Sequence, residues 1–268
     1  MHRLALFAAL ALAPSVYGAD PELRRVTAEE TALIGALSAS AVLAQFVKAP
    51  AEPRWASGVL FDDAVRDALR ASSPQARANA ATASDFGYFA LALYPAVVDA
   101  GLVTWVGRGK ADLAVQLALV DVEAVAINGL ITAALQRTVG RARPFTRDCA
   151  TNPHPECTQR DSNTSFVSGH ASVVFTGATV LCFEHARLSL YGAADAAVCP
   201  IALAVAGTTG ALRVVADKHY ATDVIAGAAI GALVGAGVSA FHFPSSDGIR
   251  RGLTGTQEGR GVAYFVRF

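Results

Sequence analysis

Three short polar stretches of the chain carry residue types that could bind an oxyanion, and each borders a long apolar run. The first, residues 136–144, contains Gln136 and three arginines and ends in Arg143-Pro144. Arginines at this spacing can form a fork for oxyanions, and the proline disfavours continuation of a helix. The alternative is a solvated basic helix end, which the helix dipole stabilises without any ligand.

The second stretch contains Ser168-Gly169-His170, immediately before an apolar run. Ser168 is a good N-cap residue, and Gly169 lets a ligand approach the backbone closely. Free N–H groups at a helix start, beside a hydroxyl and an imidazole, form a cradle for an anion. An ordinary helix cap followed by a surface histidine is the alternative.

The third stretch, residues 212–223, contains Arg213, His219 and Asp223. His219 and Asp223 are four positions apart, so on a helix they would share a face. A carboxylate at one ring nitrogen fixes the tautomer and leaves the other nitrogen free to attack. Arg213 adds a further fork for phosphate. A salt-bridged helix start in an interhelical loop is the alternative.

These motifs, in this order, resemble the type 2 phosphatidic acid phosphatase and vanadium haloperoxidase superfamily. The resemblance covers residues 136–223 directly, and it rests on the R-P, S-G-H and R-x5-H-x3-D patterns. Any one of these patterns is weak alone, whereas three in order, each at a helix end, are specific. The resemblance implies an all-helical phosphatase.

The resemblance also implies a role for each site residue. His219 would attack phosphorus and form a phosphohistidine, with Asp223 orienting the ring. His170 would protonate the leaving alkoxide and then help to activate water. The phosphoryl oxygens would be held by Arg143, Ser168, the Gly169 amide and Arg213. The implied reaction is vanadate-sensitive and uses no metal or cofactor, so positioning and fixed positive charge would provide the catalysis.

Three positions depart from the family pattern, which has lysine at Gln136, proline at Val167 and serine at Leu212. The lost lysine removes a charge-assisted contact of about 1.5–3 kcal/mol from a phosphate site. Arg137 is an auxiliary candidate, but one step turns about 100° around a helix, so it would not simply replace Gln136. Weaker activity or a shifted substrate is the expected consequence.

The composition indicates a protein rich in apolar helices. Hydrophobic residues make up 53% of the chain and charged residues 16%, against about a quarter charged in a soluble domain. Six segments are apolar enough for buried or membrane helices, each near the ~20 residues that cross a bilayer core. They are residues 31–48, 86–106, 113–135, 170–187, 197–215 and 223–242. The predicted fold class is therefore an all-α polytopic bundle of six apolar helices.

The segments 86–106 and 113–135 contain acidic residues well inside them, which are costly within a membrane. Asp99 lies in the first of them, and Asp121 and Glu123 lie in the second. Three functions therefore stay open. They are a membrane phosphomonoesterase acting on a lipid phosphate, a soluble periplasmic non-specific acid phosphatase, and a catalytically weakened binding or transport protein. Haloperoxidase chemistry is the least favoured, because an apolar bundle suits lipid better than peroxide.

The flanking segments have patterns of their own. Residues 1–19 read as a secretory signal peptide, with a charged start, a short apolar core and small residues at the end. Residues 58–80 read as an amphipathic surface helix interrupted near Pro74. Residues 20–245 would form the phosphatase domain. Of the remaining tail, 246–268, residues 262–268 alternate like a strand.

The four cysteines fall into two pairs with different expectations. Cys149 and Cys157 share one polar loop and are close enough to form a disulfide in an exported protein. Cys182 and Cys199 lie in apolar segments, where we expect buried free thiols.

Basic residues suggest an orientation in the membrane. Those at 108, 110, 187, 250, 251 and 260 would share the cytoplasmic face, so the loop 137–167 and the stretch 216–222 would face outward. We therefore expect a bacterial inner-membrane protein with a periplasmic site. A cleaved N-terminus conflicts with this, unless 31–48 does not span, the first stretch is retained, or the orientation is reversed. The formal net charge is zero, which gives no basis for nucleic-acid binding, and the pattern predicts no oligomeric state.

Overall fold

The computed structural model describes residues 23–244, without 152, 154, 159 and 160, together with the backbone of two strands at 250–255 and 262–267. The expected signal peptide, residues 1–19, lies outside the described residues. The expected division into a domain ending at 245 and a tail stays a prediction.

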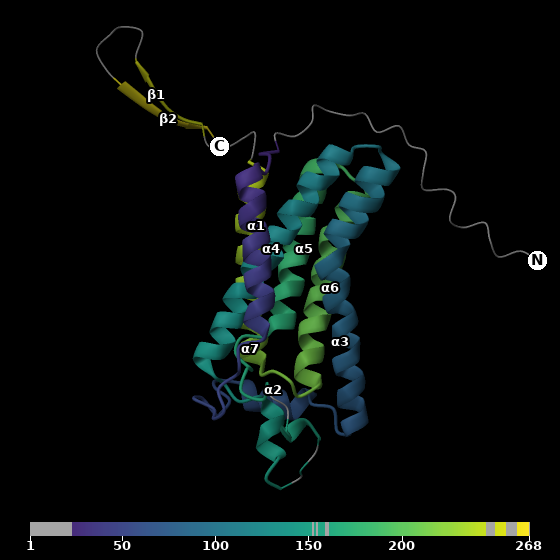
Figure 1. Ribbon diagram of the computed structural model, residues 1–268, viewed down its shortest axis with the longest axis vertical. Coiled ribbons are helices and arrows are strands. Elements are labelled where there is room, and N and C mark those ends of the chain that lie inside the picture. Colours follow the sequence, from purple (N-terminus) through teal and green to yellow (C-terminus); the bar gives the residue numbers. More distant parts are fainter. Residues whose placement is uncertain are drawn as a thin grey trace, which may run out of the picture.

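The described body is helical, and its long helices run side by side along the long axis of the molecule (Figure 1). These are α1 (Ala28–Gln45), α3 (Pro74–Tyr94) with its π-helical continuation η1 (Pro95–Gly107), α4 (Ala111–Val139), α5 (Gly169–Leu188), α6 (Asp195–Val215) and α7 (Ala221–His242). Shorter elements are α2 (Asp62–Leu69) and the 3-10 turns η2 (Pro144–Asp148), η3 (Pro155–Thr158) and η4 (Gly192–Ala194). Strands β1 (Arg250–Gly255) and β2 (Val262–Arg267) pair antiparallel, so the tail pattern predicted one strand and missed its partner.

All six apolar segments expected from the sequence are largely helical, but they differ in whether they are long and apolar enough to cross a membrane. Four helices of the described chain are long and apolar enough to cross a membrane: Pro74–Gly107, Ala111–Val139, Gly192–Val215 and Ala221–His242. The helices α1 and α5 are not among them. The four apolar helices support a membrane protein.

Close contact between α5 and α7 sets the position of the motif loops. A Cβ added at Gly231 would lie 2.0 Å from the Ser172 carbonyl oxygen, and one at Gly227 would lie 2.5 Å from that of Ser168. Only glycine permits so close an approach of two helix backbones. The start of α5, with its Ser168 cap, is therefore pressed against the start of α7.

The sequence pattern indicated one helix over residues 58–80, interrupted near Pro74, whereas the structure has two separate helices there. The helix α2 ends at Leu69, and Pro74 begins α3 instead of breaking an existing helix. The Ser73 side chain caps α3 by accepting from the Ala76 amide at 3.1 Å. Proline is favoured at a first helical position, because it lacks an N–H that would have no partner there.

Both cysteine pairs are disulfides. Cys149–Cys157 closes the polar loop, as predicted. Cys182 and Cys199 are also bonded, with a Cα–Cα distance of 4.5 Å, so the expectation of free thiols was wrong. This bond joins α5 to α6, and an apolar neighbourhood in the sequence does not tell whether two thiols face each other across a helix pair.

Candidate active site

The three polar stretches meet at one end of the bundle. The α4 helix ends at Gly140, whose φ of 62° is the left-handed conformation that favours glycine, and the chain then turns toward Arg143. Arg143, Gly169, His170, Arg213 and His219 all line one cavity of about 630 Å³. The structure thus brings together residues that are up to 76 positions apart, as the motif order predicted.

The nucleophile candidate is oriented by a backbone carbonyl. His219 is 2% exposed, and its Nδ1 lies 2.8 Å from the Ser165 carbonyl oxygen. A carbonyl oxygen only accepts, so Nδ1 carries the hydrogen and Nε2 keeps its lone pair. Nε2 lies 3.5 Å from an Arg143 guanidinium nitrogen. Burial, reinforced by Arg143 and Arg213, holds the pKa of His219 well below its usual value, so the ring is neutral and able to attack.

The expected direct contact between Asp223 and His219 is wrong. His219 lies in the turn before α7, which begins at Ala221, so the rule that residues four apart share a helix face does not apply. The Asp223 carboxylate instead accepts from the Ser165 hydroxyl at 2.6 Å and from the Tyr220 amide at 2.9 Å. Asp223 therefore acts on His219 through Ser165, whose carbonyl holds the ring.

The arginines of the first stretch separate into different roles. Arg141 is completely buried and pairs with Asp223 at 2.5 Å and Asp62 at 2.7 Å. Arg137 bonds the carbonyl oxygens of Val47 and Gln45 just past the end of α1, at 3.0 and 3.2 Å. It is not among the cavity-lining residues, so its expected auxiliary role is not supported by its position. Only Arg143 of the three lines the cavity.

Arg143 and Arg213 give the cavity its positive charge. The Arg143 guanidinium is held by Asp161, through its carbonyl at 3.0 Å and its carboxylate at 2.8 Å. Burial lowers the pKa of Arg143 from its usual value, although the group stays a cation near neutral pH. Arg213 donates to the Ser84 hydroxyl at 2.9 Å, and its buried Nε has no partner among the described residues. An orphan donor beside a cavity suits an incoming oxyanion.

The start of α5 forms one wall of the cavity. Ser168 is the N-cap, and its hydroxyl oxygen lies 3.4 Å from the Ala171 amide. It is completely buried and is not a lining residue, so its contact with a phosphoryl oxygen stays a prediction. Gly169 does line the cavity, where a Cβ would lie 3.4 Å from the Gln136 amide nitrogen.

Gln136 stands where the family pattern has a lysine, and it makes a side-chain amide hydrogen bond that a lysine would not reproduce. Its side-chain amide donates to the Val167 carbonyl at 2.9 Å and lines the cavity. The glutamine thus ties the end of α4 to the residue before the Ser168 cap. It supplies a neutral donor where the family pattern supplies a positive charge.

His170 has a partner that no motif contains. Its Nε2 lies 2.7 Å from the carboxylate of Asp85 on α3, and its ring packs on Tyr88 with centroids 4.8 Å apart. Sequence reasoning missed Asp85 and Ser165. For Asp85 a signal was available, because it is the one acidic residue between Pro74 and Val98 in an otherwise apolar helix.

Comparison with known proteins agrees with this geometry. Residues 118–247 match the model of the PAP2 superfamily, and this range contains all three motifs. This region of the chain, residues 118–247, belongs to the PAP2 superfamily. The Asp85 position and the α2 helix lie outside the matched range.

Two proteins similar to this chain are phosphatases by name. A lipid A 1-phosphatase of Porphyromonas gingivalis is 36% identical over 99 residues, which are 35% of this chain and 21% of that protein. The chain thus spans about a fifth of the length of that relative. A transmembrane PAP2 type phosphatidylglycerolphosphate phosphatase from Bacillus subtilis superposes with a TM-score of 0.50 at 20% identity. That match covers 78% of this chain and 92% of the other, and it shows a shared fold.

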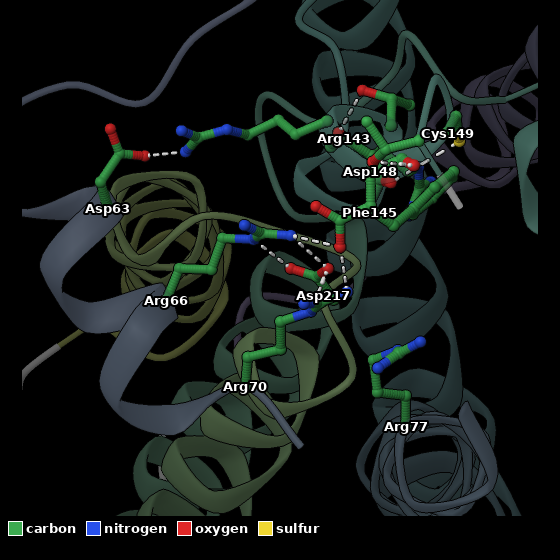
Figure 2. Close-up of polar contacts among 12 residues, drawn as sticks. Asp63, Arg66, Arg70, Arg77, Arg143, Phe145, Asp148, Cys149 and Asp217 are labelled. Carbon is green, nitrogen blue, oxygen red and sulfur yellow. Dashed lines mark hydrogen bonds and ion pairs between the residues drawn. The ribbon is translucent and has the colours of Figure 1, made fainter. Parts of the chain in front are cut away.

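The short helix α2 holds the loop that carries His219 of the PAP2 motif. Figure 2 shows Arg66 and Arg70 converging on Asp217 in the turn after α6. Arg66 makes two bonds to that carboxylate, at 2.6 and 2.8 Å, and Arg70 lies 2.7 Å from it. Asp217 has a φ of 59°, a conformation that costs energy for a residue with a side chain. The two arginines therefore fix a strained turn two residues before His219.

In the part of the chain that the structure describes, no group of three or more His, Cys, Asp or Glu side chains could hold a metal ion. Metal-free catalysis stays a prediction from the family resemblance.

Proposed function

We propose that this PAP2 protein is a phosphomonoesterase that removes phosphate from a lipid phosphate through a phosphohistidine at His219. The observation that carries the proposal is the shape of the cavity. At one end it is lined by Arg143, Arg213 and the two histidines. From there it continues as an apolar groove.

The groove runs between α1, α3 and α4. Its walls include Ala41, Val42, Leu93, Val122 and Val125. The Val42 and Leu93 side chains are 60% and 52% exposed, so the groove opens sideways onto the apolar surface of the bundle. Gln136 and Asp121 line it 15 positions apart on one helix, which corresponds to about 22 Å at 1.5 Å per residue. A phosphate head would bind among the cations while a hydrocarbon tail lies in the groove.

The chemistry follows from the positions of the two imidazoles. The His219 Nε2 lone pair attacks phosphorus while Arg143 and Arg213 neutralise the phosphoryl oxygens. The bond between phosphorus and the ester oxygen breaks, and His170 gives that oxygen a proton. Water then attacks the phosphohistidine and gives its proton to the neutral His170. The P–N bond breaks, phosphate leaves, and both histidines return to their starting states.

The proposed location is a bacterial inner membrane with the active site on the periplasmic side. Cys149–Cys157 lies in the loop that carries the first motif, and disulfides persist in oxidising compartments. The four apolar helices supply the membrane part.

Phosphate release by the detergent-purified protein tests the proposal. The substrates would be phosphatidate, phosphatidylglycerol phosphate, undecaprenyl diphosphate and lipid A, with p-nitrophenyl phosphate as the soluble comparison. We expect a higher kcat/KM for at least one lipid than for the soluble ester, and a loss of about 10³-fold or more in His219→Ala. Lipid hydrolysis that is unchanged in His219→Ala would contradict the proposal.

The same preparation separates the two other functions. Recovery of active protein in a salt wash without detergent, with no preference for lipids, would support a soluble acid phosphatase. Binding of lipid phosphates without release of phosphate from any of them would support a binding protein.

A further inference from the structure

The general acid of the proposed reaction is held by a carboxylate from outside the matched family region. Asp85 on α3 contacts Nε2 of His170 at 2.7 Å, and it also lies 3.7 Å from an Arg213 nitrogen. The Asp85 side chain is 51% exposed, at the rim of the site, whereas the His170 side chain is 26% exposed. Asp85 thus lies between the general acid and a phosphate-binding cation.

This contact decides which ring nitrogen faces the substrate. A carboxylate accepts hydrogen bonds, so Nε2 of His170 donates to Asp85. The other nitrogen, Nδ1, is then the one available to the substrate in the cavity that His170 lines. In the protonated ring both nitrogens carry hydrogen. The hydrogen on Nε2 stays bonded to Asp85, and the proton on Nδ1 passes to the substrate.

The surroundings of His170 disfavour the protonated ring, and Asp85 opposes that effect. Burial, followed by the positive charge of Arg213, lowers the pKa of His170, and Arg143 acts in the same direction. His219 faces it from the loop before α7 and is neutral. Two carboxylates line the cavity: Asp161 pairs with Arg143 at 2.8 Å, and Asp121 lies 15 positions before Gln136 on α4, far along the groove. The Asp85 carboxylate opposes these effects from α3.

We propose that Asp85 is a positioning residue for His170, which keeps Nδ1 of the protonated ring directed at the ester oxygen of the substrate. The proposal rests on the proposed function. As the P–O bond breaks, the Nδ1 proton passes to the leaving alkoxide oxygen, His170 becomes neutral, and Asp85 retains its hydrogen bond from Nε2. A leaving group that is stable as an anion does not need this proton.

The test compares kcat/KM for an alkyl phosphate and an aryl phosphate in Asp85→Asn. The probes are phosphatidate or glycerol phosphate as alkyl esters, and p-nitrophenyl phosphate as the aryl ester. Because kcat/KM reports the steps up to departure of the alcohol, we expect a loss of roughly 10- to 100-fold for the alkyl esters. The aryl ester should lose less than about threefold, since p-nitrophenolate leaves without a proton. Asp85→Glu should recover most of the alkyl activity.

The pH profile gives a second readout that a merely structural role would not change. Activity on the alkyl ester needs protonated His170, so it falls as pH rises through the pKa of that group. Without the carboxylate the protonated ring is less stable, and the falling limb should move to lower pH by about one unit. The matched control is Asp67→Asn on α2, which removes the same charge from an exposed side chain and should leave both readouts unchanged.

Three results would overturn the proposal. They are an equal loss on both ester types, no loss on either, and a pH profile that does not move in Asp85→Asn. Failure of the proposed function gives a different result: a soluble phosphatase would hydrolyse the soluble esters and not the lipid, whereas a wild type that hydrolyses no ester would overturn both proposals. The leaving-group comparison would still be made with glycerol phosphate and p-nitrophenyl phosphate. A thermal melt of each variant confirms folding, which an exposed Asp-to-Asn change should leave intact.

Discussion

The two ends of α5 are both rich in buried polar groups, but they differ in which groups lack partners. At the start, Gly169 and His170 face a cavity with two arginines and a second histidine. About 22 Å along the helix, His185 bonds Asp99 at 3.1 Å and Asp195 at 2.5 Å. Beside that cluster, the buried carboxylates of Asp121 and Glu184 have no hydrogen-bond partner among the described residues.

The two ends differ in whether the unpartnered polar atoms belong to a cationic donor or to carboxyl groups. Near the start of α5 the unpartnered atoms include a charged donor, Nε of Arg213, while the carboxylate of Asp223 is fully bonded. At the other end the unpartnered atoms include the carboxylate oxygens of Asp121 and Glu184. A free donor beside cations can bind a phosphate, whereas a cluster of carboxyl groups supplies no cation to neutralise one. The comparison therefore assigns phosphate chemistry to one end only.

The largest effect should come from removing a cation at the phosphate end. Arg143→Ala should lower kcat/KM for a lipid phosphate by about 10²- to 10³-fold, because a preorganised donor is lost where transition-state charge develops. Arg147→Ala is the matched control four residues along the same loop, since Arg147 is half exposed and pairs with the exposed Asp63. It should change kcat/KM by less than about twofold. Equal losses in the two variants would break the assignment of the cation site.

Neutralising one buried carboxylate at each end of α5, first Asp223 and then Glu184, tests the comparison directly. Asp223→Asn should lower the free energy of unfolding by about 3 kcal/mol, because it leaves the buried Arg141 with one carboxylate instead of two. It should also lower kcat by about 10-fold, because it weakens the hydrogen bond that positions Ser165, whose carbonyl oxygen orients the His219 ring. Chemical denaturation and steady-state kinetics measure these two effects.

Glu184→Gln is the same change at the other end of α5. Glu184 is completely buried without a partner in the described chain, so a neutral isostere should leave both stability and kcat nearly unchanged. A large loss of activity in this variant would show that the acidic end takes part in the reaction.

The groove can be narrowed without touching the phosphate end. Ala92→Phe places a ring in the wall between the lipid tail and α3, and it should raise KM for a long-chain lipid phosphate by about 10-fold. Hydrolysis of p-nitrophenyl phosphate should change by less than about twofold. Ile225→Phe on the outer face of α7 is the control, because that residue is 56% exposed and does not line the groove. A rise in KM for both substrates would contradict the separation of head and tail sites.

The smallest change in activity that we expect to be measurable is at a position where this chain departs from the family pattern. Gln136→Lys adds a positive charge to the cavity and loses the amide bond to the Val167 carbonyl. The two changes oppose each other, so KM should fall by only about threefold with little change in kcat. A 100-fold gain would mean that the glutamine had disabled the site.

The sequence predicted the elements that periodicity and chemistry mark locally. The six apolar segments are helices, and the motif order placed Arg143, His170, Arg213 and His219 around one cavity. These features depend on short stretches whose residue types are specific. The helical fold could therefore be predicted, together with the identity of most cavity-lining polar residues.

What could not be predicted depends on contacts between distant segments. Asp85 meets His170 across 85 positions, and Arg66 meets Asp217 across 151 positions. Neither spacing follows a local rule. The error over Asp223 has a local cause, since a helix that begins at Ala221 leaves His219 outside its periodicity. Because α7 begins two residues after His219, the His219 ring contacts the carbonyl oxygen of Ser165 and not the carboxylate of Asp223.

The most direct test of the account is to trap the covalent intermediate. Purified protein would be mixed with a lipid phosphate radiolabelled in the phosphoryl group and quenched in alkali, in which phosphohistidine is stable, and the labelled peptide would be identified. The account predicts label on His219, and none in His219→Ala. Label on His170 or another residue, or full turnover by His219→Ala, would contradict it.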